Sequence, residues 1–233
     1  MAHKKLIRFA ELNTFSNVLQ FPKNIKGNWH GFFRNDNPIV LELACGKGEY
    51  AVGLGSLYPD KNFIGVDLKG NRLWVGARKA IENKLYNVAF LRTQIDQINE
   101  YFSRDEVNEI WITFPDPQLR KSKAKKRLTH PKFLRLYKQF LKPDGYIHLK
   151  TDSPDLYNFT RTVIKMYGCL LNKDYLDLYE QQNTSRELQI KTHYESLDIA
   201  QTNRIHYLCF SLPQQLPGKE FEEQLKEMLS HEG

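Results

Sequence analysis

The segment that indicates the fold most directly is Ile39-Val-Leu-Glu-Leu-Ala-Cys-Gly-Lys-Gly48. Its apolar first half is typical of a buried strand, and a helix-like run follows until Pro59 ends it. Between them, Gly46 and Gly48 let a ligand approach the backbone closely, and the start of the helix presents free amide donors. The stretch therefore predicts a cofactor-binding loop, although an ordinary tight turn uses the same residue types.

Outward from this stretch, apolar runs alternate with segments of helical period from Ile39 to about Leu212. This alternation predicts βα units around a mostly parallel sheet. Thr129 and Ser153 precede helical segments and are expected to cap them. We expect residues 1–37 to form an N-terminal arm with an irregular lead-in, and residues 38–233 to form one α/β domain. Strands are expected at 39–44, 63–67, 88–91, 109–114, 146–151 and 204–212, and helices from the glycine turn to 57 and at 70–83, 95–102, 129–141, 153–167 and 221–229.

Composition places the chain among globular proteins with a continuous core. It has 233 residues, of which 41% are hydrophobic and 26% are charged. No run of about 18 apolar residues and no secretory signal occurs, so we expect a cytoplasmic protein without a membrane span. Cys45, Cys169 and Cys209 are far apart and form no C-x-x-C pair, which predicts reduced thiols. The histidines show no metal-ligand spacing, and we expect no metal.

Positive charge is concentrated in one short segment. The net charge is +7, and the segment from Arg120 to Arg127 contributes six positive charges and no acid. Such a run is often only a solvated surface, but its concentration favours a polyanionic partner, so we expect it to contact RNA phosphates. The residues in question are Arg120, Lys121, Lys123, Lys125, Lys126 and Arg127.

Glu42 indicates which cofactor the glycine turn holds. A carboxylate at the end of an apolar strand needs a partner, and the α-amino group of S-adenosylmethionine supplies one, whereas a dinucleotide pyrophosphate would be repelled. A nicotinamide oxidoreductase is the alternative, because Gly46-x-Gly48-x-x-Ala51 fits the dinucleotide fingerprint and Asp67 lies about 20 residues further on.

Three other polar residues follow predicted strands. Asp67 ends the second strand and is expected to accept hydrogen bonds from both ribose hydroxyls. Gln94 follows the third strand, where its amide could hold an adenine. Asp116, in a stiff Pro115-Asp-Pro117 loop, follows the fourth strand and should project at the crevice where open α/β sheets bind ligands. A plain turn is the alternative for this loop.

The chain contains five segments in this order: Glu42–Gly48, Asp67, Phe114–Pro117, Lys150–Asp152 and Thr192–Glu195. Together these segments resemble the bacterial tRNA (guanine-N7)-methyltransferase family. The resemblance covers nearly all of Ile39 to Leu212 and is most specific in the Phe-Pro-Asp-Pro loop with its basic tail. It implies a Rossmann-like class I methyltransferase domain over residues 38–233, with a seven-stranded, mostly parallel sheet, helices on both faces and an antiparallel last strand. The implied substrate is the guanine at position 46 in the variable loop of tRNA.

The resemblance also implies roles for individual residues. Asp116 would be the catalytic residue and would also contact the cofactor. Three residues differ from those common in the family: Ala44 replaces a glycine, Gln94 an aspartate and Gln118 a tryptophan. The cofactor pocket would contain Glu42, Gly46, Gly48, Asp67, Gln94 and Asp116, and the guanosine would contact Arg120, Asp152, Thr192, His193, Tyr194 and Glu195.

Guanine N7 carries a lone pair in the ring plane and no proton. Methyl transfer to it therefore needs alignment and electrostatic stabilisation more than a strong base. The product guanine is cationic, so a nearby carboxylate such as that of Asp116 would stabilise the developing charge. A non-catalytic RNA-binding module is the second alternative, and the complete set of Glu42, Gly46, Gly48 and Asp67 argues against it.

Overall fold

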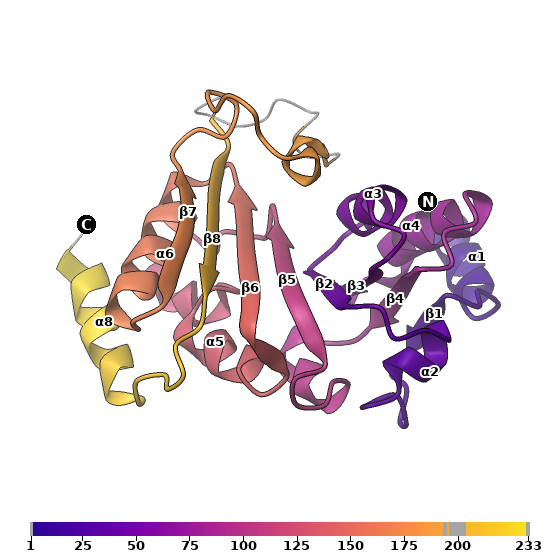
Figure 1. Cartoon of the computed structure of the whole chain (residues 1–233), viewed down its shortest axis with the longest axis horizontal. Helices are drawn as coiled ribbons and strands as arrows, with labels where there is room; N and C mark the ends of the chain where they lie inside the picture. The colour runs from indigo at the N-terminus through magenta and orange to yellow at the C-terminus, as the bar shows by residue number, and fades with distance from the viewer. Residues whose placement is uncertain (1, 193–194, 196–203, 232–233) are drawn as a thin grey trace.

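Eight strands form one sheet in the computed structural model, which describes residues 2–192, 195 and 204–231 (Figure 1). Their order across the sheet is β1-β4-β3-β2-β5-β6-β8-β7. The strands are β1 (Val18–Gln20), β2 (Ile39–Leu43), β3 (Asn62–Asp67), β4 (Val88–Arg92), β5 (Val107–Thr113), β6 (Leu141–Thr151), β7 (Leu170–Tyr175) and β8 (His206–Ser211).

Strand directions confirm the predicted mostly parallel sheet with an antiparallel last strand. Each neighbouring pair from β1 to β6 is parallel, and β8 lies antiparallel between β6 and β7. The described residues form eight strands rather than the expected seven, because β1 in the N-terminal lead-in pairs with β4. Most of β7 is exposed and polar, so it lacks the apolar run by which the other strands were predicted.

Helices cover both faces of the sheet, as expected. Side chains that alternate along β2 enter two separate cores: Leu41 and Leu43 pack with α2, α5 and α6, whereas Val40 packs with α3 and α4. The helices are α1 (Ala2–Leu12), α2 (Trp29–Phe33), α3 (Glu49–Leu57), α4 (Gly70–Glu82), α5 (Pro131–Tyr137), α6 (Pro154–Met166) and α8 (Glu220–His231), with 3-10 helices η1 (Ile95–Glu100), η2 (Lys121–Lys126) and η3 (Arg186–Gln189).

Of the two predicted helix caps, one is confirmed and one is wrong. Ser153 caps α6, and its hydroxyl accepts a hydrogen bond from the Leu156 amide at 3.3 Å. The cap of α5 is His130 and not Thr129, because Pro131 occupies the first helical position and moves the start of the helix by one residue. The Thr129 hydroxyl instead bonds that of Thr160 at 2.7 Å and joins α5 to α6.

The lead-in is more regular than the sequence indicates. Helix α1 packs on α4, where the Trp74 indole donates a hydrogen bond to Glu11 at 2.7 Å and Leu12 is 1% exposed. Trp29 of α2 stacks on Phe102 with ring centroids 5.3 Å apart. Residues 2–33 therefore contribute two helices and a strand to the same folded body.

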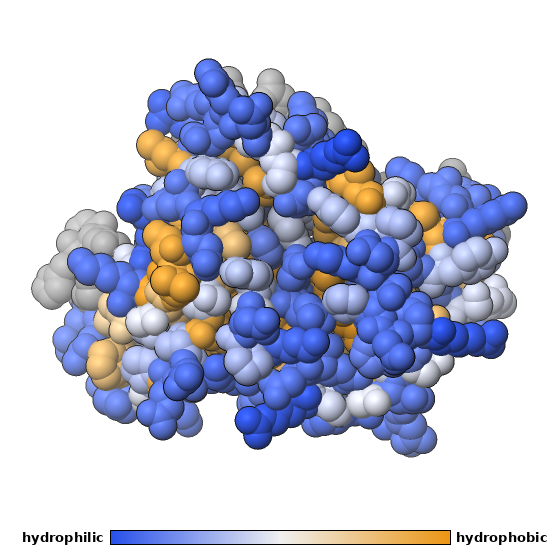
Figure 2. All heavy atoms as spheres, viewed as in Figure 1, coloured by the Kyte–Doolittle hydropathy of each residue, from blue (hydrophilic) through white to orange (hydrophobic). Residues whose placement is uncertain are grey.

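The face shown in Figure 2 is mostly hydrophilic, with small scattered hydrophobic areas. Leu170 and Leu171 of the edge strand β7 are exposed, but Asn172, Lys173 and Asp174 follow them. Charged residues on an edge strand disfavour pairing with another sheet.

Candidate active site

A cleft of about 470 Å³ lies where the parallel strands end. The carboxyl ends of parallel strands meet at one edge of a sheet, and this edge brings together residues that are far apart in the sequence. Six residues that the sequence analysis selected line this cleft: Glu42, Gly46, Asp67, Asp116, Asp152 and Thr192.

Glu42 is a buried carboxyl group, with 3% of the residue exposed. One carboxyl oxygen accepts a hydrogen bond from the Ala51 amide at 2.8 Å, and the other accepts one from the Thr113 hydroxyl at 2.9 Å. Burial nevertheless raises the pKa of Glu42 to about 8. A cationic group bound in the cleft would stabilise its ionised form, whereas a pyrophosphate would not.

The glycine turn is held in place by Asp67. The Gly46 amide donates to one Asp67 oxygen at 3.0 Å, and the Lys69 amide donates to the other at 2.8 Å. Gly46 has a φ of 56° and open space beside its α-carbon, so a ligand can approach the backbone there. Ala44 has a φ of 55°, the left-handed region, which explains why a glycine suits this position.

The Pro-Asp-Pro loop places Asp116 at the cleft. Asp116 is exposed, and its carboxylate accepts a hydrogen bond from the Gln118 amide at 3.0 Å. Phe114 and Gln118, on either side, have φ values of 47° and 50°. Non-glycine residues pay about 1–2 kcal/mol for this conformation, and such strain often occurs at functional sites.

Arg127 has a different position from the one predicted. It is 5% exposed, and its guanidinium donates to the carbonyls of Pro117 and Gln118 at 3.1 and 3.3 Å and lies 4.5 Å above the Phe159 ring. The inward direction of this side chain removes Arg127 from the predicted phosphate contacts. It fastens the Asp116 loop instead, because the turned backbone leaves carbonyls that need donors.

The rest of the basic segment is on the surface. Arg120, Lys121, Lys123, Lys125 and Lys126 are exposed, and the last four lie on η2. Lys125 and Lys126 line a second cleft of about 540 Å³ together with Gln94. This second cleft shares Ala44 and Asp67 with the first, so Gln94 lies beside the first cleft rather than in it.

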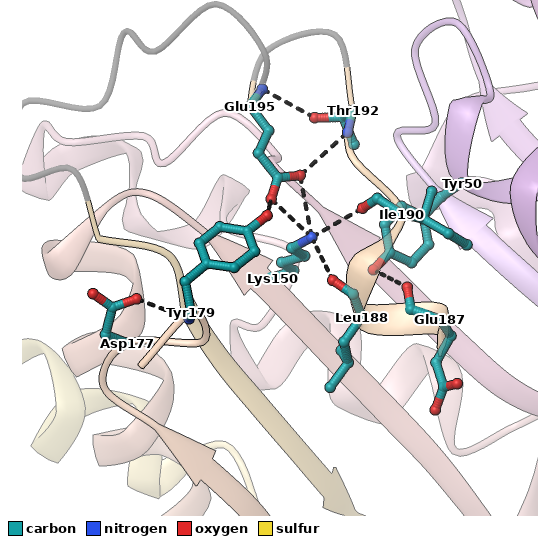
Figure 3. A network of polar contacts seen from close by, with 9 residues as sticks. All are labelled: Tyr50, Lys150, Asp177, Tyr179, Glu187, Leu188, Ile190, Thr192 and Glu195. Carbon is teal, nitrogen blue, oxygen red and sulfur yellow. Dashed lines mark hydrogen bonds and ion pairs between the residues drawn. The ribbon is translucent and has the colours of Figure 1, made fainter. Parts of the chain in front are cut away.

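Glu195 does not line either of these clefts. Its side chain is 3% exposed and pairs with the ammonium of Lys150 at 2.9 Å (Figure 3). Lys150 is fully buried, and this burial lowers its pKa, although Glu195 opposes the shift. No role was predicted for Lys150, although a lysine within the predicted strand 146–151 is a signal of a buried polar contact. His193 and Tyr194 lie outside the described residues.

Two other observations concern metals and membranes. No group of histidine, cysteine or acidic side chains among the described residues could hold a metal ion, and the three cysteines are free. Within the same residues, no helix has both the length and the apolar character needed to cross a membrane.

The sheet, the glycine turn and the acids that end β2 and β3 define a class I S-adenosylmethionine-dependent methyltransferase. A family model described as "Putative methyltransferase" matches residues 36–208. Solved structures of the 16S rRNA methyltransferase KamB and of a 30S ribosomal A1408 methyltransferase from an uncultured bacterium share the fold, with TM-scores of 0.61 and 0.57. They are 14% and 15% identical, over 80% of this chain and 94% and 93% of theirs.

More similar relatives narrow the class to one family. A tRNA (guanine-N(7)-)-methyltransferase from Bacteroides thetaiotaomicron is 46% identical over 92% of this chain and 88% of its own. The enzymes of that name from Christiangramia forsetii and Lactococcus lactis are 45% and 35% identical, over 89% and 76% of this chain and 97% and 82% of theirs. The chain belongs to the tRNA (guanine-N7)-methyltransferase family. This membership excludes the alternative interpretation of the chain as a nicotinamide oxidoreductase.

Proposed function

We propose that this protein transfers the methyl group of S-adenosylmethionine to N7 of a guanine in tRNA, the variable-loop guanine that the family resemblance implies. One observation carries the proposal: the carboxyl groups of Glu42, Asp67 and Asp116 line a single cleft, and exposed lysines of η2 lie on the segment that follows Asp116. The names of the relatives in the family support the same substrate.

The residues of the cleft suit S-adenosylmethionine. Glu42 would bind the α-amino group, because a buried carboxyl group gains most from a cationic partner. Asp67 would accept hydrogen bonds from the ribose hydroxyls, and Gly46 would leave room for the cofactor beside the backbone. Gly48 would contribute to the shape of this loop, since a β-carbon there would clash with the Phe90 ring. Gln94 would reach the adenine from the neighbouring cleft. When bound, the cofactor supplies an electrophilic methyl group on a positively charged sulfur.

Asp116 would act on the guanine. N7 needs no deprotonation, so the carboxylate of Asp116 would orient the base and stabilise the positive charge that develops on it. Asp152 and Thr192 line the same cleft and would hold the guanosine, and Arg120 would contact it from the end of the loop. His193 and Tyr194 remain part of this proposed substrate contact through the family resemblance. Glu195, whose side chain is buried against Lys150, would act on the substrate through its hydrogen bonds to Thr192.

The exposed residues of the basic segment would bind RNA phosphates. Lys125 and Lys126 line the second cleft, and Lys121 and Lys123 are exposed on the same 3-10 helix, where the backbone on either side of an unstacked base would pass. Residues 38–233 would form the methyltransferase domain and residues 1–37 its N-terminal lead-in. A cytoplasmic location stays a prediction.

The direct test is methylation of tRNA with labelled S-adenosylmethionine. An unmodified tRNA transcript is incubated with the protein, and the labelled nucleotide is identified by nuclease digestion and mass spectrometry. We expect 7-methylguanosine in the variable loop, and none in a transcript with adenine at that position. Label at another nucleotide would overturn the proposed substrate. Tight tRNA binding without any methyl transfer would favour the RNA-binding module.

A further inference from the structure

The segment from Arg186 to Thr192, here called the strap, begins with η3 and ends at Thr192. Figure 3 shows the part of the strap from Glu187 to Thr192. Its last residue, Thr192, lines the cleft, and the residue is 5% exposed. The strap has only one short 3-10 helix of its own among the described residues, so contacts with the rest of the protein determine where Thr192 lies.

Lys150 contacts the strap at two carbonyls and also pairs with Glu195, which lies just beyond the strap. Its ammonium donates to the carbonyls of Leu188 and Ile190, both at 3.0 Å, and pairs with the Glu195 carboxylate at 2.9 Å. An ammonium has three hydrogens to donate, and these three partners use all of them. Lys150 is 0% exposed and therefore has no group left for the substrate or the cofactor.

Glu195 connects Lys150 to Thr192. A Glu195 carboxylate oxygen accepts a hydrogen bond from the Thr192 amide at 3.2 Å, and the Thr192 hydroxyl accepts one from the Glu195 amide at the same distance. This reciprocal pair has the pattern of a capping box. The Tyr179 hydroxyl also donates to the carboxylate. The position of Thr192 at the cleft thus depends on an ion pair that starts on β6.

The other side of the strap is attached to α3. The Tyr50 hydroxyl donates to the Glu187 carbonyl at 2.7 Å, and the Tyr58 hydroxyl donates to the Glu187 carboxylate at 2.7 Å. Ile190 packs so closely on Gly53 that a β-carbon there would lie 3.0 Å from it. Because α3 begins at the glycine turn, the strap connects the helix of the proposed cofactor loop to Thr192.

We propose that Lys150 is a positioning residue. It holds the strap so that Thr192 lies at the same cleft as the proposed cofactor loop. This inference rests on the proposed methyl transfer to tRNA. Stability alone does not explain the choice of residues, since an apolar pair of similar volume stabilises a buried site as well as an ion pair does. A lysine ammonium supplies three donors from a single atom, one each for two carbonyls and a carboxylate, and an apolar residue supplies none.

The test is the substitution Lys150→Met, which keeps the length of the side chain and removes its donors. At saturating tRNA and S-adenosylmethionine we expect kcat to fall about 10- to 100-fold, because small displacements of a contact residue cost rate. The dissociation constant for S-adenosylmethionine should stay within about threefold, since Lys150 does not line the cleft. Trypsin should cut faster after Arg186 and Lys191, both of which lie on the strap. The matched control, Lys173→Met on the exposed strand β7, should change none of these.

Two further variants separate positioning from folding. The double variant combines Lys150→Met with Glu195→Met and leaves no buried carboxylate unpaired at this site. Its melting temperature should therefore return towards that of the wild type, while its kcat stays low. Tyr50→Phe loosens the other side of the strap and should lower kcat several-fold with the ion pair intact. The inference is overturned if the double variant regains wild-type kcat, or if every folded variant methylates normally. A wild-type protein that methylates no tRNA would refute the proposed function instead, and the trypsin assay would still report on the strap.

Discussion

At the scale of single residues, Asp116 has the most direct of the proposed chemical roles. Its carboxylate is exposed at the cleft on a loop that Arg127 and two left-handed residues keep in shape. We expect Asp116→Asn to lower the methyl transfer rate by about 10²–10³-fold, the usual effect of removing one preorganised electrostatic group. Single-turnover rates at saturating cofactor and tRNA measure this step without the contribution of binding.

The asparagine variant is its own structural control. Its side-chain oxygen can still accept the hydrogen bond from the Gln118 amide, so the loop and the melting temperature should stay unchanged. A single-turnover rate close to that of the wild type would leave Asp116 with a role in binding or in loop shape only.

Glu42 predicts a pH dependence of cofactor binding. Burial raises its pKa to about 8, so the free protein holds a proton there at pH 7. A bound α-amino group favours the carboxylate, so binding releases that proton and affinity should rise with pH from about 6 towards about 8, by up to about tenfold per unit. The α-amino group itself loses its charge near pH 8, which ends the rise.

Calorimetry in buffers of different ionisation enthalpy measures this proton release. Glu42→Gln keeps two hydrogen-bonding atoms but cannot ionise, so it should bind more weakly and release no proton from this position. Proton uptake by the wild type on binding, or an affinity that does not change with pH, would contradict the proposed contact with the amino group.

At the scale of elements, η2 is expected to supply the electrostatic part of tRNA binding. Replacing Lys123, Lys125 and Lys126 by Ala should weaken binding and lower the slope of log affinity against log salt by about 2–3, because each of three phosphate contacts releases roughly 0.7–0.9 counterion. The element itself should persist, since buried Ala124 and Arg127 hold it to the fold. Filter binding at several salt concentrations gives the slope.

The control removes the same number of charges elsewhere on the surface. Lys79, Lys173 and Lys219 are exposed on α4, on β7 and just before α8. Their triple replacement by Ala should leave the slope much closer to that of the wild type. Equal slopes for the two triple variants would mean that η2 is only a solvated segment.

At the scale of the whole molecule, the N-terminal helix is expected to be part of the folded body. Leu12 of α1 packs against Gly70 of α4 and is 1% exposed, whereas Leu6, also on α1, is 70% exposed. Leu12→Ala should lower the free energy of unfolding by about 2–4 kcal/mol, as removal of a buried leucine side chain does. Leu6→Ala should change it by less than about 0.5 kcal/mol. Urea denaturation measures both, and equal effects would indicate that α1 is a loosely attached arm.

The sequence by itself determined the central strands and the acidic residues at their ends. An apolar run such as Ile39–Leu43 predicts a buried strand from local composition, and the rule that ligands bind at the carboxyl ends of parallel strands needs no further coordinates. Glu42, Asp67 and Asp116 therefore line one cleft as their positions in the chain predicted. The family resemblance added Asp152, Thr192 and the antiparallel direction of β8, which the alternation of apolar residues alone does not specify.

Which polar groups form hydrogen bonds and ion pairs with one another follows from the tertiary structure alone. Lys150 meets Glu195 45 residues away, and Trp74 bonds Glu11 63 residues away, so no local pattern links either pair. Arg127 belongs to a basic run by sequence, yet it turns inward and donates to two carbonyls of the strained Asp116 loop. A buried donor or acceptor must find a partner wherever the fold brings one, and that requirement depends on the packed chain rather than on neighbouring residues.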